Sequence, residues 1–97
     1  MIYWLHPEAQ EDPREAAEFY RDKAGTALSL ALLAEFERSA GLLLQHPGLG
    51  RLWRHGKRRL VMKRFRYALI YSVVGDQIRI LAIAHHSRRP GYWRRRT

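Results

Sequence analysis

The sequence contains no cysteine. This absence excludes disulfide bridges, thiolate catalysis and zinc sites built from cysteine, and it fits a reducing compartment. No apolar run approaches the ~18 residues that a membrane span needs. The first residues also lack the basic start and long apolar stretch of a secretory signal. We therefore expect a small soluble protein of the cytoplasm, with no membrane partner.

Motifs of common nucleotide, hydrolase and metal chemistry are also lacking. There is no glycine-rich phosphate loop, no serine nucleophile-elbow motif and no His-Glu-x-x-His motif. The one adjacent histidine pair, His85 and His86, ends a predicted strand, where neighbouring side chains point to opposite faces. Two such rings are unsuited to chelating one metal ion, so the sequence predicts no metal and no cofactor.

Acidic residues are scarce in the second half of the chain. Residues 1–50 hold eight acidic and four basic residues, whereas residues 51–97 hold fourteen basic residues and a single acid, Asp76. Fifteen of the eighteen basic residues are arginine, whose planar guanidinium suits phosphate and carboxylate recognition. Such a skew favours a polyanion or an acidic protein as partner.

The length of the chain predicts a single domain over residues 1–97.

The first half of the chain predicts two helices. Asp12 resembles an N-cap, followed by a proline suited to the first turn and by Glu15, which would complete a capping box. That helix should reach about Lys23, with an earlier start near Glu8 and a bend at Pro13 as the alternative. Gly25 suits the positive φ that often follows a helix end. A second helix is expected over residues 26–45, because apolar residues recur there every three or four positions. Its stripe consists of Leu30, Leu33, Phe36, Ala40, Leu43 and Leu44, and Leu28 and Leu32 broaden it.

Short β-favouring segments account for most of the rest. Residues 2–6 predict an opening strand, and residues 58–65, 67–74 and 77–85 predict three more. The last three are joined by short links and should form an antiparallel meander. The order β-α-α-β-β-β predicts an α+β fold, with an N-terminal helical hairpin packed on a twisted antiparallel sheet. The open sheet face and the C-terminal tail are left to carry the basic charge.

Basic and aromatic side chains concentrate on this predicted sheet and tail. Aromatic residues there could stack on bases, although anchoring the end of the chain is their more common role. The candidates for binding a target or partner are Lys63, Arg64, Arg66, Arg88, Arg89, Tyr92 and Trp93. Cleavage of RNA without metal would need a base, an acid and cations for the phosphorane. The residues available for those roles are His85, His86, Arg66 and Arg88.

Two segments resemble a known family. Residues 64–71 read RFRYALIY, and residues 80–93 read ILAIAHHSRRPGYW, with the distinctive ending Ala-His-x-x-Arg-Arg-Pro-x-Tyr-Trp. Together with the order of elements, they closely resemble the ParE/RelE superfamily. These proteins are toxins of type II toxin–antitoxin systems and are also called plasmid stabilisation proteins. The resemblance implies a cognate antitoxin, which we expect to be acidic and to wrap the groove between the helical hairpin and the sheet.

The resemblance implies two alternative activities. RelE-like members cut mRNA in the ribosomal A site without metal, whereas ParE-like members poison DNA gyrase and have no established hydrolytic activity as a class. RelE-like proteins commonly carry an arginine at the strand position that is Ala68 here, and an apolar side chain cannot hold a phosphate. Arg66 would compensate if strand alternation placed it on the face of Ala68, and Arg88 could match the family's second arginine.

The absence of a cation at position 68 and the ParE-like tail favour the binding activity. We therefore expect a ParE-like gyrase inhibitor rather than an enzyme. The first alternative is a RelE-like, ribosome-dependent mRNA endonuclease, with the ribosome and mRNA as partners. The second is a non-toxic basic module that binds nucleic acid.

Overall fold

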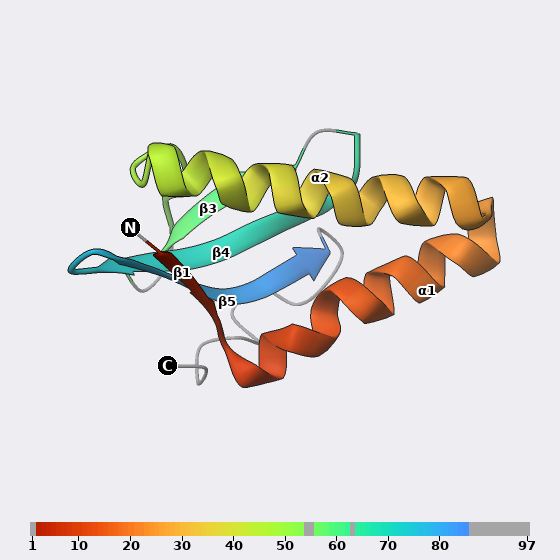
Figure 1. Ribbon diagram of the computed structural model, residues 1–97, viewed down its shortest axis with the longest axis horizontal. Helices are drawn as coiled ribbons and strands as arrows, with labels where there is room; N and C mark the ends of the chain where they lie inside the picture. Colours follow the sequence, from red (N-terminus) through yellow and green to blue (C-terminus); the bar gives the residue numbers. More distant parts are fainter. Residues whose placement is uncertain (1, 54–55, 63, 86–97) are drawn as a thin grey trace.

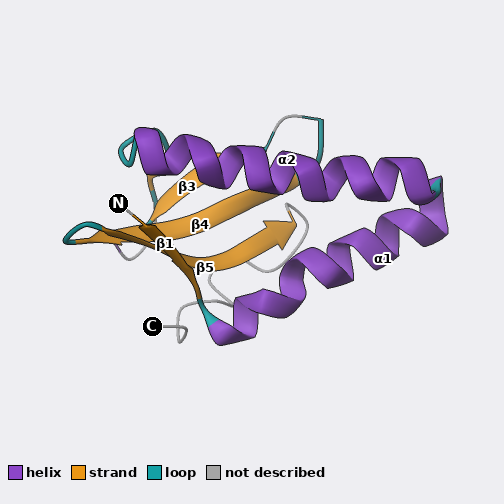
Figure 2. Ribbon diagram, in the orientation of Figure 1, coloured by secondary structure: helices purple, strands orange, loops and turns teal. Residues whose placement is uncertain are grey.

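The chain folds into a five-stranded sheet with two long helices on one of its faces (Figure 1). The computed structural model describes residues 2–53, 56–62 and 64–85. The elements are β1 (Ile2–Leu5), the 3-10 helix η1 (Pro7–Glu11), α1 (Asp12–Ala24), α2 (Thr26–Gln45), β2 (Arg51–Leu52), β3 (Arg58–Val61), β4 (Tyr67–Val74) and β5 (Gln77–His85). The helices form one layer and the strands the other (Figure 2), which confirms the predicted α+β class.

The sheet is mixed, with the strand order β1-β5-β4-β3-β2. Strands β3, β4 and β5 form the predicted antiparallel meander. β1 instead pairs in parallel with β5, from Ile2 opposite Gln77 to Leu5 opposite Ile80. The expectation of an antiparallel sheet is therefore corrected at this edge. No tight turn connects β1 to β5, so the chain is free to place them in the same direction.

The main core lies between the sheet and the helices. Its large buried side chains are Leu32, Phe36, Leu43, Tyr67, Leu69, Tyr71, Ile78, Ile80 and Ile83. The β4–β5 register shifts between Ile70 and Tyr71, so Tyr71 pairs with Ile80 while Ile70 pairs with Ala82. Ile70 and Ala82 belong to a smaller cluster, which also contacts Trp53 and Ala84. Strand alternation assigns this cluster to the face turned away from the helices.

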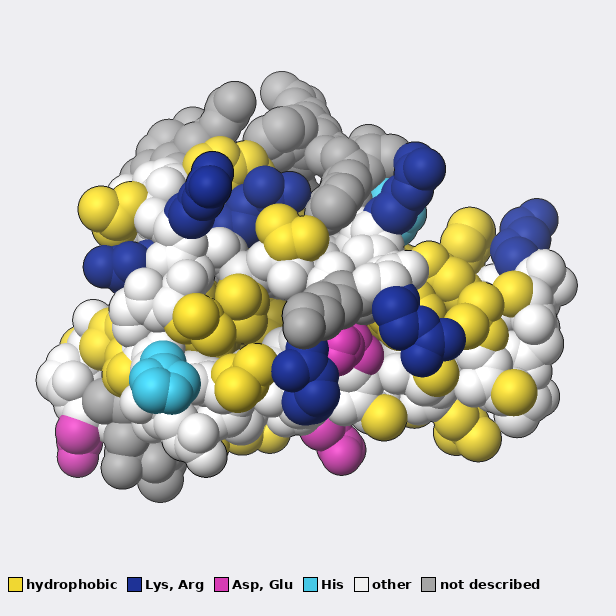
Figure 3. Space-filling view, turned by 90° about the horizontal axis from the view of Figure 1, so that it is seen from above, with side chains coloured by type: hydrophobic (Ala, Val, Ile, Leu, Met, Phe, Trp, Pro, Cys, Tyr) yellow, Lys and Arg dark blue, Asp and Glu magenta, His cyan; other side chains and the backbone are white. Residues whose placement is uncertain are grey.

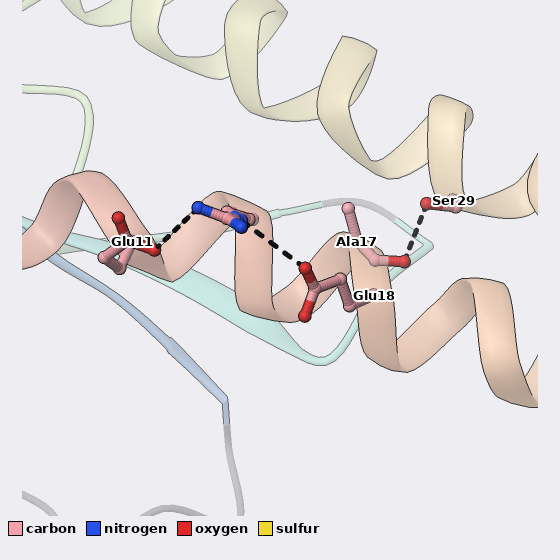
Figure 4. A network of polar contacts seen from close by, with 5 residues as sticks. Glu11, Ala17, Glu18 and Ser29 are labelled. Atoms are coloured by element: carbon pink, nitrogen blue, oxygen red, sulfur yellow. Dashed lines mark hydrogen bonds and ion pairs between the residues drawn. The ribbon is translucent and has the colours of Figure 1, made fainter.

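Helix α2 has the predicted bounds, but its buried face differs from the predicted stripe. Leu32 is buried, whereas Leu30 is 61% exposed, so the assignment of Leu30 to the core is wrong. The buried face includes Ser29, whose hydroxyl donates a hydrogen bond of 2.7 Å to the Ala17 carbonyl of α1 (Figure 4). Because a small polar residue lies at this contact, the buried face of α2 is rotated about the helix axis from the face that the apolar residues alone indicate.

Helix α1 does not begin with the predicted cap at Asp12; as in the alternative of an earlier start, helical structure already precedes it in η1. Its N-cap is Glu11, which makes no side-chain capping bond, and Asp12 is already helical, so the predicted capping box at Asp12 is wrong. The 3-10 turn η1 leads the chain directly into α1, and the buried Asp12 carboxylate accepts a hydrogen bond of 3.0 Å from the Ile83 N–H of β5. Gly25 has a φ of 95° after the helix end, as predicted.

The segment around β3 is shorter than predicted. β3 ends at Val61 instead of continuing to residue 65, and residues 64–66 form a bend in which Arg64 has a φ of 71°. A positive φ interrupts the extended path that a strand requires. The two-residue strand β2, which the sequence did not predict, pairs with Arg58 and Arg59.

Candidate functional site

Charge is divided between the two layers of the molecule. None of the five described strands contains Asp or Glu, and eight of the nine acidic residues lie in η1, α1 and α2. Figure 3, viewed from the side of α2, shows Lys and Arg side chains spread among apolar ones, with few acidic side chains between them. The sheet layer is therefore the part of the described chain best suited to an anionic partner.

A hollow of about 240 Å³ lies between α2 and the bend that follows β3. Its lining residues are Ala31, Ala34, Glu35, Arg38 and Arg64. Glu35 accepts two hydrogen bonds from Arg38, at 2.6 and 3.0 Å, and this pairing raises the pKa of the Arg38 guanidinium. Because that pair is internally neutral, the net charge of the hollow comes from Arg64. The hollow lies between the helical layer and the sheet, where an antitoxin was expected to bind.

The start of β4 and the end of β5 bring two candidate residues to the same end of the sheet. Arg66 is exposed and directly precedes Tyr67, which pairs with His85. The His85 and Tyr67 rings meet edge to face, with centroids 5.0 Å apart, and Tyr67 lies 6.3 Å from the Tyr20 ring of α1. His85 thus joins a chain of aromatic contacts on the helix side of the sheet.

Arg66, which was expected to compensate for Ala68, lies just before the strand that carries Ala68. Arg66 lies in the bend before β4 and not within the strand. It is exposed between Phe65 and Tyr67, which both pack into the helix-side core, and that it shares the face of Ala68 stays a prediction. Ala68 itself is 1% exposed, and it lies opposite Val61 on β3 and Ala84 on β5.

The sheet face opposite the helices carries two arginine–tryptophan contacts. The Arg59 guanidinium lies 4.9 Å from the centre of the Trp53 ring, and the Arg79 guanidinium lies 5.6 Å from the Trp4 ring. Contacts of this kind hold a cation over an aromatic face while leaving other guanidinium donors available.

A second, larger hollow of about 550 Å³ lies along the β2–β3 edge of the sheet. It is lined by Leu49, Arg51, Leu52, Trp53, Arg59, Leu60 and Val61. Leu49, Leu52 and Val61 are large apolar residues that remain about half exposed or more. The hollow therefore combines an apolar lining with arginines at its border, which makes it a second candidate for binding a partner.

The family model of the ParE toxin of type II toxin–antitoxin systems, parDE, matches residues 3–90. The chain belongs to the ParE toxin family. Among solved structures, it is similar to one described as the chromosomal ParDE toxin–antitoxin system from P. aeruginosa, with a TM-score of 0.76 and 22% sequence identity. That alignment covers 87% of this chain and 92% of the other, and it shows a shared fold. No curated protein matches the chain.

Several candidate residues of this ParE-family chain lie outside the described residues. They are Lys63, His86, Arg88, Arg89, Tyr92 and Trp93. Their roles remain predictions. Of the candidates that the structure describes, Arg64 and Arg66 share the bend, and His85 lies at the neighbouring end of β5.

The edge hollow is the feature of this ParE-family chain that the sequence pattern did not predict. Its signal is weak because β2 contains only two residues, too few to show the period of a strand. Within the described part of the chain, no group of three His, Cys, Asp or Glu side chains is arranged to hold a metal ion. The described helices include none with the length and apolar character of a membrane span.

Proposed function

We propose that this ParE-family toxin inhibits DNA gyrase by binding it in the cytoplasm and is neutralised by an acidic antitoxin. The observation that carries the proposal is Ala68. This side chain is 1% exposed and apolar, and it lies within the β4 ladder. Neither its chemistry nor its burial allows it to contact a phosphate group, so this strand position lacks a ligand that RNA cleavage would use.

The surroundings of His85 support the same proposal. Its ring packs edge to face on Tyr67, and this contact ties the end of β5 to the start of β4. A general acid or base must reach the proton that it transfers. A histidine that stabilises an aromatic contact has a sufficient structural reason to be present, without a catalytic one.

The charge distribution supports an acidic antitoxin as the neutralising partner. The strands contain no acid, and Arg64 supplies the net charge of the hollow beside α2. An antitoxin segment with carboxylates would be attracted to both regions and would meet apolar side chains at the hollow. We therefore expect toxin–antitoxin association to weaken as salt concentration rises.

The test is a supercoiling and DNA-cleavage assay with purified gyrase, with and without the toxin. We expect lost supercoiling or trapped cleavage complexes, and reversal of the effect by the antitoxin. His85→Gln should inhibit gyrase within about threefold of the unchanged toxin if His85 is structural. Loss of a general acid or base would instead lower an activity by a factor of about 10²–10⁴. Both proteins are compared at a temperature where circular dichroism shows each to be folded.

A ribosome assay supplies the opposing outcome. If gyrase is unaffected but the toxin cuts mRNA on translating ribosomes, and His85→Gln abolishes the cutting, the proposal is wrong and the RelE-like activity replaces it. If the toxin affects neither gyrase nor ribosomes and does not arrest growth on induction, the proposal also fails. A basic nucleic-acid-binding module would then be the better description.

A further inference from the structure

Within the described residues, the β2–β3 edge of the sheet is only partly covered. β2 pairs with Arg58 and Arg59 and extends no further, although β3 continues to Val61. The chain before β2 turns away from this edge, because the Gly50 N–H donates to the Tyr71 hydroxyl on the helix-facing side of the sheet. The hollow described above lies beside the part of β3 that this turn leaves uncovered.

The backbone of Val61 faces this uncovered edge. The next residue, Met62, donates its N–H to the Tyr67 carbonyl across the β3–β4 ladder. Backbone groups of successive strand residues point alternately to the two sides, so the N–H and C=O of Val61 point away from β4. An exposed strand edge of this kind can pair with an added strand from another chain.

The side chains around this edge restrict what can bind there. Leu52 is 71% exposed and Val61 is 49% exposed, which leaves apolar surface for a partner's apolar side chain. Arg51 is exposed at the same hollow, and Arg59 is held over Trp53. Two copies of this chain joined at the edge would bring these arginines together, and a nucleic acid would not pair with the Val61 backbone.

We propose that this edge binds an extended peptide segment with alternating acidic and apolar residues, which adds to the sheet beside Val61. Its apolar side chain would occupy the hollow, and its carboxylates would meet Arg51 and Arg59. This inference rests on the proposed function, since the segment is assigned to the antitoxin. It specifies a second contact, separate from the hollow between α2 and Arg64.

The decisive variant is Val61→Pro, with Val61→Ala as its matched control. Proline removes the outward N–H and blocks strand addition, yet it spares the β3–β4 ladder because that N–H points away from β4. Alanine removes side-chain atoms but keeps the N–H. With purified antitoxin as the probe, we expect Val61→Pro to weaken binding at least tenfold and Val61→Ala to weaken it less than threefold.

A charge test addresses the same surface independently. Arg51→Glu and Arg21→Glu change the net charge equally, but Arg21 is an exposed residue of α1 in the helical layer. We expect Arg51→Glu to weaken antitoxin binding several-fold more than Arg21→Glu does. Equal effects would mean that the antitoxin responds to total charge only, which would contradict recognition at the edge.

Amide exchange keeps the test decisive if Val61→Pro fails to fold. Antitoxin binding to the unmodified toxin should slow exchange at the Val61 amide at least tenfold. Unchanged exchange at Val61 in a saturated complex, or equal binding of a folded Val61→Pro variant, would overturn the inference while leaving the antitoxin as a partner. Absence of any antitoxin binding would instead remove the proposed partner, and self-association abolished by Val61→Pro would assign the edge to a second copy.

Discussion

Removal of the Tyr71 hydroxyl should cost a large part of the stability of this domain. The hydroxyl donates to the Pro47 carbonyl at 2.7 Å and accepts from the Gly50 N–H at 2.9 Å, and Tyr71 has no exposed surface. Tyr71→Phe keeps the ring but leaves both backbone groups without this partner. The segment that loses its anchor leads into β2, so the wall of the edge hollow should loosen as well.

The magnitude follows from the burial of the two backbone groups. A buried polar group left without a partner costs about 1–3 kcal/mol. The Gly50 amide is buried, whereas Pro47 is half-buried and its carbonyl can recover part of the loss from water. We therefore expect Tyr71→Phe to lower the free energy of unfolding by about 2–4 kcal/mol. A domain of this size has about 5–15 kcal/mol in total, so the melting temperature should fall by roughly 10–30 °C.

Urea denaturation followed by tryptophan fluorescence measures this loss. Tyr3→Phe is the matched control, because Tyr3 is 41% exposed and its change should stay within about 0.5 kcal/mol. If Tyr71→Phe also stayed within about 0.5 kcal/mol of the unchanged protein, the two hydrogen bonds would not anchor the segment and the reasoning would be refuted.

Alkaline pH offers a second readout of the same residue. Burial raises the pKa of Tyr71 above its usual value. The folded protein then holds this proton more tightly than the unfolded chain does, so the related stability is fully present below a pH of about 10 and is lost as pH rises through the folded pKa. Tyr71→Phe should show a weaker decline in stability above about pH 10 than the unchanged protein.

Three further substitutions test separate packing arguments, each by urea denaturation. Gly50→Ala would place a Cβ 2.7 Å from Cε1 of Tyr71 and 3.0 Å from the Arg59 carbonyl oxygen, and should cost about 2–4 kcal/mol; a neutral result would contradict this close packing. Asp12→Ala should cost about 1–3 kcal/mol because Ile83 loses its acceptor, whereas Asp12→Asn keeps an acceptor oxygen and should lose less than half as much if the contact is a hydrogen bond. Leu32→Ala should cost about 2–5 kcal/mol, and Leu30→Ala about 0.5 or less; equal losses would restore the predicted stripe.

The elements with strong local signals could be predicted from the sequence. Helix α2 and strands β4 and β5 have the expected bounds, since their periodicity is long and a glycine turn separates the two strands. The start of α1 was predicted less well, because Asp12 satisfies the usual pattern of an N-cap but bonds to a strand 71 residues away in sequence. No local pattern reveals such a partner.

The candidate site was predictable in its charge but only partly in its geometry. The imbalance between the halves of the chain correctly placed basic charge on the sheet layer. The bend before β4 could not be predicted in the same way, because it depends on a positive φ at Arg64, a residue other than glycine. The edge hollow depends on where the chain before β2 is anchored, and that is decided by a side chain on β4.

Two strands of the sheet, β5 and β3, pair with their outer neighbours over only part of their length, and the unpaired parts differ in what borders them. β1 pairs with β5 only as far as Ile80, and beyond it the Asp12 carboxylate binds the Ile83 N–H, so this side is closed from within the chain. Beyond β2, the side of β3 is bordered by Arg51, and within the described residues no carboxylate closes it in the same way. Arginine at an edge repels another copy of the same basic protein but attracts an acidic strand. Under the proposed function, the same charge would disfavour self-association of the free toxin and favour an acidic partner.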